Sequence, residues 1–364
     1  MPSTDVRIDP APGVPLAPFC TLGVGGSARW FVRATSAQAV EAAHEWASDR
    51  GLPLFVLGGG SNLVIADAGI EALVVHIGLT GVEVATDAGD TIVTAAAGEP
   101  WDALVADLVS RGLAGVECLS GIPGSVGGTP IQNVGAYGQD VGHVIDAVSA
   151  FDRQAGTMVR IGTSDCGFAY RQSRFKRDDA VRFVVCGVTF RLRPGPPNLT
   201  YPDIVAEFSA SGVGESDLGR ARHAVLAVRQ RKGMVLDATD VDTHSVGSFF
   251  VNPIVSESTY DRVAAHVPGG RVPRFVMPNG DVKIPAAWLI ETAGFSKGHG
   301  DGPVGVSSKH SLALVNRGGA TARDVVALAA RIKRAVIDRF GIALRAEPMC
   351  VGFTDDPDVE FLAG

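Results

Sequence analysis

Three consecutive glycines, Gly58, Gly59 and Gly60, constrain this chain more than any other feature of its sequence. They follow the apolar run 54–57, which is too short for a helix and therefore predicts a strand. Ser61 and Asn62 come next. Because glycine has no Cβ atom, successive backbone N–H groups of such a loop can approach an anion, and the loop could bind a diphosphate. A glycine run alone is more often a tight turn.

A second glycine-rich stretch covers residues 121–138 and begins Gly121-Ile-Pro-Gly-Ser-Val-Gly-Gly. It lacks the lysine that a phosphate-binding P-loop requires. A third run, Gly23-x-Gly25-x-x-Ala28, leads into a strand-like pattern instead of opening a helix, as a dinucleotide-binding Rossmann loop would. Neither motif is supported, but two glycine-rich loops in one chain favour a bound cofactor.

The pattern of apolar residues predicts an α+β fold. A capping box formed by Thr35 and Gln38 is expected to open a helix that ends near Arg50. The proline-rich segment 194–198 predicts a domain boundary within 195–240. Further helices are expected at 100–112, 217–232, 286–293 and 322–340. Strands or extended segments are expected at 28–33, 54–57, 72–77, 81–85, 91–96, 144–153, 158–161, 181–191, 312–315 and 343–351.

Length and composition indicate a folded chain of several domains. Its 364 residues exceed one ordinary core of ~100–200 residues, so two or three domains are expected. With 46% hydrophobic and 20% charged residues, the whole chain is expected to fold. The net charge is -7, and the longest cationic cluster, 229–232, is short, which argues against a nucleic-acid partner.

Cysteine usage and apolar segments indicate a cytoplasmic protein. The five cysteines form no Cys-x-x-Cys pair and are expected to be reduced. Residues 1–18 lack the basic start and apolar run of a signal peptide, and no segment reaches the ~20 apolar residues that cross a bilayer. The eight histidines include no His-x-x-x-His pattern, so we expect no metal site.

Four glycine-containing motifs resemble the flavin loops of the UDP-N-acetylenolpyruvoylglucosamine reductase family. Their order and spacing match, and the resemblance spans 21–352. The motifs are Thr21-Leu-Gly-Val-Gly-Gly, Val56-Leu-Gly-Gly-Gly-Ser-Asn-Leu, Gly121-Ile-Pro-Gly-Ser-Val-Gly-Gly and Asn133-Val-Gly-Ala-Tyr-Gly. The resemblance implies an FAD-binding domain of the vanillyl-alcohol-oxidase type, followed by a C-terminal α+β substrate-binding domain.

In that family the loops bind FAD noncovalently. The resemblance implies that backbone N–H groups of 58–62 carry the diphosphate and that the flavin ring lies near 124–128. NADPH would reduce the flavin, which would then reduce the enolpyruvyl group of UDP-N-acetylglucosamine enolpyruvate to give UDP-N-acetylmuramate for peptidoglycan synthesis. The implied cofactor residues are Gly58, Gly59, Gly60, Ser61, Asn62, Gly124, Ser125, Gly127 and Gly128.

The reaction of the family needs a cation or acid at the substrate carboxylate and a proton for C2. Arg171 lies in Tyr-Arg-Gln-Ser-x-Phe, which is similar to the motif whose arginine meets that carboxylate. Ser248, in Gly-Ser-Phe-Phe, resembles the proton donor to C2. Glu347 matches the second group at the developing enolate, although Arg345 replaces an acidic residue common in the family. Taken alone, each would be an ordinary surface or turn residue.

Five further residues resemble substrate contacts. Tyr201, in Leu-Thr-Tyr-Pro, looks like the mobile tyrosine that closes over the nucleotide diphosphate in the larger branch of the family. Val251 departs from a lysine common in the family just before an asparagine. The other residues expected near the diphosphate are Lys232, Asn252, Lys283 and Lys297.

We predict three domains, in which 1–78 and 340–364 form one FAD-binding part, 79–232 the second, and 233–339 the substrate-binding domain. The expected partners are the nucleotide sugar and NADPH, with no nucleic acid and no membrane, and the chain is expected to be a monomer. Two alternatives stay open. One is an FAD-linked oxidase with the same flavin domain, and the other is a noncatalytic protein that binds nucleotide sugars.

Overall fold

The computed structural model describes residues 6–177, 179–210, 216–267 and 271–364. The chain forms two compact units, each assembled from three segments. The N-terminal unit comprises Met1–Val14, Ala28–Gly60 and Glu71–Arg231. The C-terminal unit comprises Pro15–Ser27, Ser61–Ile70 and Lys232–Gly364.

The N-terminal unit contains a four-stranded sheet in the order β1-β2-β5-β3. Strand β3 is the predicted apolar run before the glycines, and it pairs parallel to β5. Helix α1 (Ala37–Ser48) connects β2 to β3, which gives the βαβ arrangement common in mixed folds. The strands are β1 (Ala11–Pro15), β2 (Ser27–Ala34), β3 (Leu54–Leu57) and β5 (Ile70–Ile77).

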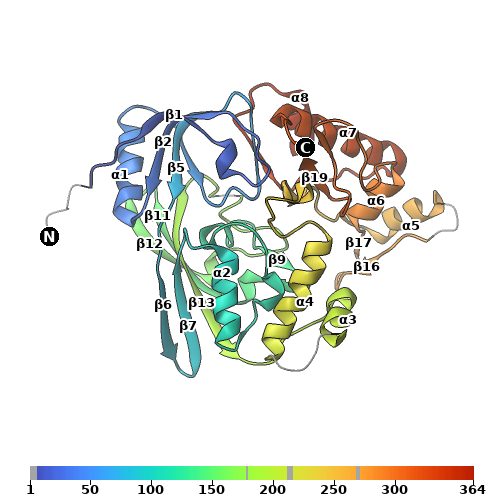
Figure 1. Ribbon diagram of the computed structural model, residues 1–364, viewed down its shortest axis with the longest axis horizontal. Coiled ribbons are helices and arrows are strands. Elements are labelled where there is room, and N and C mark those ends of the chain that lie inside the picture. The colour runs from blue at the N-terminus through green and yellow to red at the C-terminus, as the bar shows by residue number, and fades with distance from the viewer. Residues whose placement is uncertain (1–5, 178, 211–215, 268–270) are drawn as a thin grey trace. The chain divides into compact units, whose positions relative to one another are not determined.

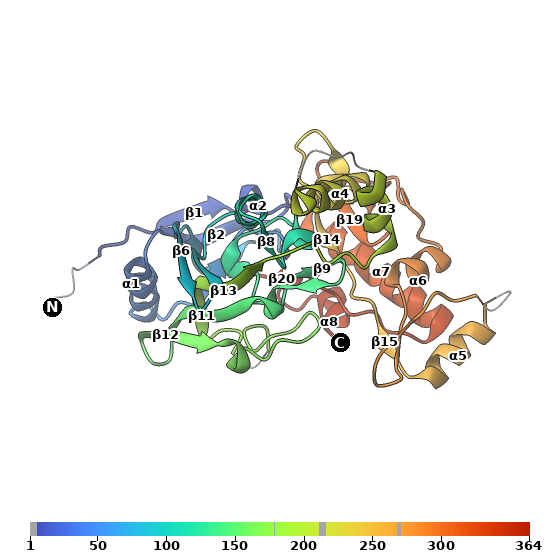
Figure 2. The same cartoon turned by 90° about the horizontal axis from the view of Figure 1, so that it is seen from below.

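A six-stranded sheet forms the rest of this unit's β structure, with β12-β11-β13-β7-β6 in order and β8 added to β13. Neighbouring strands of this sheet pair antiparallel. Strands β11, β12 and β13 lie side by side, and β6 and β7 form a long hairpin (Figures 1 and 2). The strands are β6 (Val82–Asp87), β7 (Asp90–Ala96), β8 (Leu113–Ala114), β11 (Ile145–Asp152), β12 (Thr157–Gly162) and β13 (Phe183–Pro194).

Three helices and several short elements complete the N-terminal unit. Helices α3 and α4 pack side by side (Figures 1 and 2). The small hairpin β9–β10 carries the turn of the Asn133 motif. The helices are α2 (Trp101–Ser110), α3 (Pro202–Ala210) and α4 (Asp217–Arg231); the short elements are β9 (Gly135–Ala136), β10 (Gln139–Asp140), η2 (Glu117–Leu119), η3 (Val126–Gly128), η4 (Val141–His143) and η5 (Thr163–Asp165).

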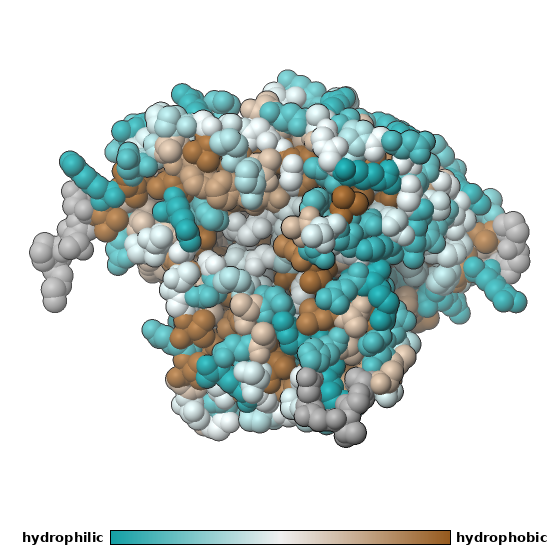
Figure 3. Space-filling view, viewed as in Figure 1, coloured by the Kyte–Doolittle hydropathy of each residue, from teal (hydrophilic) through white to brown (hydrophobic). Residues whose placement is uncertain are grey.

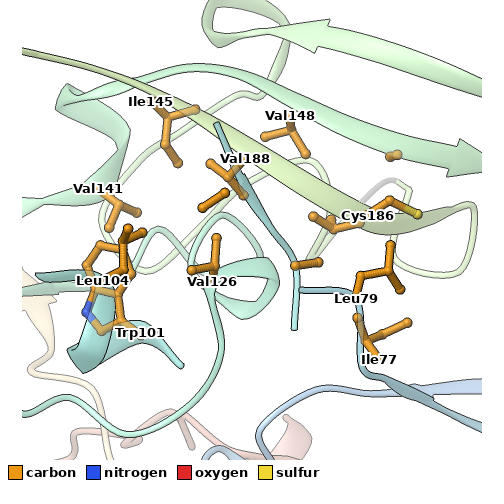
Figure 4. Packing of buried hydrophobic residues seen from close by; sticks show 14 of the residues in the cluster. Ile77, Leu79, Trp101, Leu104, Val126, Val141, Ile145, Val148, Cys186 and Val188 are labelled. Carbon is orange, nitrogen blue, oxygen red and sulfur yellow. The ribbon is translucent and has the colours of Figure 1, made fainter. Parts of the chain in front are cut away.

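The core of the N-terminal unit lies between its sheets and helix α2. Trp101 of α2 is 1% exposed, and its indole nitrogen donates to the carbonyl oxygen of Leu119 at 3.2 Å. Figure 4 shows Trp101 and Leu104 beside Val126 of the second glycine-rich stretch, with Val188 of β13 nearby. Burial of Val126 within this core therefore fixes the segment that contains the glycines.

The described residues of the C-terminal unit form three small sheets. Strand β4 pairs parallel with β20, although the two strands come from opposite ends of the chain. The second sheet has the order β14-β19-β18, and the third β15-β17-β16. The strands are β4 (Leu63–Ile65), β14 (Ser245–Ser248), β15 (Ile254–Val255), β16 (Phe275–Val276), β17 (Val282–Lys283), β18 (Val304–Val306), β19 (Ala313–Asn316) and β20 (Met349–Val351).

Helix α7 (Ala322–Phe340) is the main helix of the C-terminal unit. A capping box of Thr321 and Asp324 begins it, and Gly341, with φ of 66°, ends it in the left-handed conformation. Its buried face packs into the unit's core against side chains of β19 and α6. The other helices are η1 (Ala17–Phe19), η6 (Val241–Thr243), α5 (Glu257–Ala265), α6 (Ala286–Thr292) and α8 (Pro357–Ala363).

Most expected elements occur within a few residues of their predicted bounds. The predicted capping box at Thr35 and Gln38 is wrong, because Ser36 caps α1 by accepting a hydrogen bond from the amide of Ala39 at 3.1 Å. Helices α3, α5 and α8 had no sequence prediction. On the face in Figure 3, apolar and polar side chains alternate in patches. Within the described ranges, no helix has both the length and the apolar character that a bilayer crossing needs.

Candidate active site

The two predicted cofactor loops contact each other inside the N-terminal unit. A Cβ atom on Gly59 would lie only 2.6 Å from the Cα atom of Gly124, and one on Gly58 would lie 3.0 Å from Oγ of Ser125. Gly124 has a φ of 122°, which side chains rarely allow. Both runs therefore need glycine for close backbone packing, which the sequence alone did not distinguish from a simple turn.

The polar groups of these loops fit a phosphate-containing cofactor. Oγ of Ser125 is buried and has no hydrogen-bond partner within the part of the chain that the structure describes. Over the same described ranges, the amides of Gly59 and Gly60 donate to no backbone carbonyl. A Cβ atom on Gly128 would meet nothing within 4 Å. An orphaned hydroxyl beside amide donors and open space is the arrangement that an anionic ligand satisfies.

The amide groups of the η3 turn have a different role. Val126 donates to the carbonyl oxygen of Glu99 at 2.9 Å, and Gly127 donates to that of Ala97 at 2.8 Å. A Cβ atom on Gly127 would lie 2.6 Å from Cβ of Ala97. Gly127 is thus needed where the turn packs against the end of β7.

Arg171 lies in a tight turn of the N-terminal unit and has a φ of 57°. Ala169 and Gln172 exchange two backbone hydrogen bonds of 3.0 Å across this turn. The Arg171 guanidinium donates to the carbonyl oxygens of Gly135 at 2.5 Å and Asn133 at 3.5 Å. Its side chain is only 18% exposed. The arginine is therefore held against the turn of the Asn133 motif.

The side chain of Asn133 also binds the turn that contains Arg171. Its Nδ2 donates to the carbonyl oxygen of Ala169 at 3.1 Å, and its Oδ1 accepts from the amide of Gly142 at 2.9 Å. Asn133 is 5% exposed and has a φ of 49°. It had no predicted role, but it lies in a motif that the sequence singled out.

Ser248 and Glu347 are brought together in the C-terminal unit. Ser248 ends β14 and lies opposite Ala313 of β19. The amide of Glu347 donates to the carbonyl oxygen of Phe249 at 2.9 Å, so the residue after Ser248 binds directly to Glu347. Phe249 and its neighbour Phe250 are almost fully buried, with ring centroids 5.2 Å apart. These two apolar rings directly follow Ser248 in the sequence.

Asn62 lies next to the same segment. Its Nδ2 donates to the carbonyl oxygen of Glu347 at 3.3 Å, and its own carbonyl accepts from the amide of Met349 at 3.0 Å. A residue of the first glycine loop and the candidate acid are thus neighbours in the C-terminal unit. Arg171 belongs to the N-terminal unit.

The predicted substrate contacts differ in their surroundings. Tyr201 is 41% exposed and precedes α3, while Lys297 is exposed in the loop after α6. Lys283 is half-buried, with Nζ 5.5 Å from the ring centroid of Phe275. Lys232 is half-buried just beyond the end of α4.

Asn252 has a structural role. Its Oδ1 accepts a hydrogen bond of 2.8 Å from the amide of Ala286, the first residue of α6. This bond satisfies a donor that the helix itself leaves without a partner.

A partly buried ion pair between Arg222 of α4 and Asp102 of α2 also contacts the second glycine-rich stretch. Asp102 accepts hydrogen bonds of 2.6 Å and 2.8 Å from Arg222 and one of 2.6 Å from the amide of Gly121. Burial raises the pKa of Asp102, but the bonds from Arg222 and Gly121 outweigh it and hold the pKa below its ordinary value. Arg229, from the short cationic cluster, is 6% exposed and donates to the carbonyl oxygen of Gly121 at 3.3 Å.

Family models match both parts of the chain. An FAD binding domain covers residues 28–162, and the C-terminal domain of UDP-N-acetylenolpyruvoylglucosamine reductase covers residues 239–351. These matches agree with the predicted α+β fold, in which an FAD-binding domain is followed by a C-terminal domain.

Relatives match the chain over nearly its whole length. A UDP-N-acetylenolpyruvoylglucosamine reductase of Thermobifida fusca is 48% identical over 94% of this chain and 98% of the relative. The enzymes of the same name from Salinispora arenicola and Mycobacterium tuberculosis H37Rv are 46% and 45% identical, over 96% and 94% of this chain and 98% and 95% of theirs.

A crystal structure of a UDP-N-acetylenolpyruvylglucosamine reductase from Thermus caldophilus has the same fold. It superposes with a TM-score of 0.64 at 24% identity, over 95% of this chain and 99% of that chain. Together with the near-complete match to curated relatives, the described loops identify the chain as a member of the UDP-N-acetylenolpyruvoylglucosamine reductase family of FAD-dependent oxidoreductases.

Proposed function

We propose that this chain uses noncovalently bound FAD to reduce UDP-N-acetylglucosamine enolpyruvate to UDP-N-acetylmuramate, with NADPH as the hydride source. The observation that carries the proposal is the bond between the Glu347 amide and the Phe249 carbonyl, which places Glu347 beside the residue that follows Ser248, although the two candidates are far apart in the sequence. An FAD-linked oxidase of the same domain type would not require this pair.

The glycine loops supply the cofactor site in this proposal. Backbone amides of Gly59 and Gly60 would bind phosphate oxygens, and the buried hydroxyl of Ser125 would hydrogen-bond to the cofactor. The same site includes Gly58, Ser61, Asn62, Gly124, Gly127 and Gly128. These residues would hold FAD, which would supply the hydride-transfer chemistry between NADPH and C3 of the enolpyruvyl group.

Three side chains act on the substrate. Arg171 binds the carboxylate and stabilises the negative charge that develops there, a task suited to a permanently charged planar donor. Its bonds to two backbone carbonyls hold the guanidinium in a fixed orientation, which reduces the cost of ordering it. Ser248 donates a proton to C2, and Glu347 binds at the developing enolate. Buried Phe249 and Phe250 exclude water near Ser248.

Substrate binding involves Tyr201, Lys232, Asn252, Lys283 and Lys297 near the diphosphate. The Oδ1 atom of Asn252 accepts a hydrogen bond from the first amide of α6. Its side-chain nitrogen is therefore the group that makes the substrate contact. We retain the three-domain division at 78, 232 and 340, a monomeric state and a cytoplasmic location as parts of the proposal. The last follows from a substrate and a reductant that are both soluble nucleotides.

Anaerobic stopped-flow absorbance tests the proposal. The flavin of the purified protein is reduced with NADPH, and UDP-N-acetylglucosamine enolpyruvate is then added. We expect the oxidised flavin spectrum to return as UDP-N-acetylmuramate forms. Reduction without reoxidation would favour the oxidase, and a colourless, inert protein would favour the noncatalytic binding protein.

A further inference from the structure

Glu117 is a fully buried carboxylate for which the proposed chemistry has no use. It begins η2, and its residue is 0% exposed. Oε2 accepts from the amide of Gly115 at 2.7 Å, while Oε1 accepts from Nε2 of Gln139 at 2.7 Å and the amide of Asn198 at 3.1 Å. All three partners are donors, and their bonds compensate the cost of burying the carboxylate.

Two of these partners, Gln139 and Asn198, are distant from Glu117 in the sequence. The first of them connects Glu117 to the loop that contains Tyr137. Both ends of the Gln139 amide are used, because its Oε1 also accepts from the amide of Cys118 at 2.8 Å. Gln139 pairs with Ala136 across the β9–β10 hairpin, which leaves Tyr137 and Gly138 as its two-residue loop. Glu117 therefore fixes the base of the loop that presents the Tyr137 ring.

The second distant partner, Asn198, connects Glu117 to the segment that contains Tyr201. Asn198 follows two consecutive prolines and lies three positions before the tyrosine. The sulfhydryl of Cys118 also donates to the carbonyl oxygen of Asn198 at 3.8 Å. Only Leu199 and Thr200 separate Asn198 from Tyr201, so an anchor at Asn198 limits how far the tyrosine can move. Residues 194–201 are called the proline segment below.

The two ends meet. The rings of Tyr137 and Tyr201 pack edge to face, with centroids 5.7 Å apart and an angle of 84° between planes. A Cβ atom on Gly138 would lie 2.7 Å from Oγ1 of Thr200, so the hairpin loop and the proline segment are in direct contact. One carboxylate thus anchors both sides of the tyrosine pair.

We propose that Glu117 is a positioning residue that holds the proline segment so that Tyr201 stands where it can close over substrate. The inference rests on the proposed function, because it takes from that function the role of Tyr201. Glu117 itself contacts neither substrate nor cofactor in this scheme. Its effect on substrate binding passes through Asn198 and Gln139 to the tyrosine pair.

The test is a double-mutant cycle between Glu117→Gln and Tyr201→Ala in the FAD-loaded protein. A glutamine side chain turns one of the two acceptors into a donor that faces an N–H group, which weakens the anchor. We expect Glu117→Gln to raise KM for the nucleotide sugar about tenfold while the rate of flavin reduction by NADPH stays within about twofold of the parent. In the double variant, KM should equal that of Tyr201→Ala, because the anchor then has no ring to position.

A matched control is Asp152→Asn. Asp152 is also a buried carboxylate, 3% exposed, that accepts backbone bonds from Gln154 and Ala155, but it ends strand β11. It should lower Tm without changing KM. If Glu117→Gln does not fold, Asn198→Pro removes the same anchor from the proline segment and should raise KM in the same way.

Two results would overturn the inference. One is a folded Glu117→Gln protein with the KM of the parent. The other is a double variant whose KM increase is the product of the two single increases, which would mean independent effects. A parent protein that is reduced by NADPH but never reoxidised by the nucleotide sugar would instead refute the proposed function. The inference would then fall with that function, because it takes the role of Tyr201 from it.

Discussion

Replacing Gly59 by alanine tests the close packing of the two glycine loops. The added Cβ would lie 2.6 Å from Cα and 2.8 Å from the carbonyl carbon of Gly124, and 3.0 Å from the amide nitrogen of Ser125. Ordinary contacts begin near 3.4 Å, so the loops must separate by most of an ångström. All three neighbours are backbone atoms, which cannot turn away as a side chain could. Overpacking of this kind costs about 1–3 kcal/mol.

The expected result is a loss of both cofactor and stability. A cost of about 2 kcal/mol corresponds to a Tm lower by roughly 4–8 °C for a domain of this size. Flavin absorbance per polypeptide in the purified protein measures FAD content, and circular dichroism measures Tm. Gly162→Ala is the control, because a Cβ atom there meets nothing within 4 Å. A Gly59→Ala protein with the FAD content and Tm of the Gly162→Ala control would refute the reasoning.

Three further predictions follow from single side chains. Ser248→Ala should leave flavin reduction by NADPH intact and slow reoxidation by substrate on the order of 10²- to 10⁴-fold, measured by stopped-flow absorbance; equal reoxidation rates would remove Ser248 from the mechanism. Hydrogen bonds from Arg182 lower the pKa of Asp152 to about 2, so its stabilising contribution is present above the ordinary carboxyl pKa and is lost as pH falls through about 2; acid titrations followed by circular dichroism should show this loss in the parent and not in Asp152→Asn. Burial raises the pKa of Cys118 to about 12, so it should resist iodoacetamide at pH 8 until the protein unfolds, and mass spectrometry of the labelled peptide checks this.

Much of the fold could be predicted from local sequence patterns. Helix α7 has the expected bounds because its apolar face, capping box and terminal glycine all agree. Helix α3 was not predicted, because it is short and directly follows the proline segment. The cap of α1 was assigned to the wrong residue, since Thr35 and Ser36 are both good caps and only the backbone conformation distinguishes them.

The candidate site was predictable where it depends on motifs and hidden where it depends on tertiary contacts. The glycine loops were found because a run of glycines is rare, but their contact through Gly59 and Gly124 needs the fold. Asn252 was expected near substrate, while its bond to the start of α6 could not be read from the sequence. Glu117 carries no sequence signal, because its three partners come from positions 115, 139 and 198.

The hairpin loop of Tyr137 and Gly138 has a strained backbone that the contacts around it stabilise. Both residues have positive φ angles, 51° and 89°, as a type I′ turn requires. Asparagine or glycine would meet this requirement more easily than tyrosine, whose side chain is strained there. The strain is offset by what the ring contacts, since Tyr137 packs against Tyr201 on one side while the same hairpin presents the Gly135 carbonyl to Arg171. One small turn therefore orients two of the residues proposed to hold the substrate, and Glu117 fixes its base.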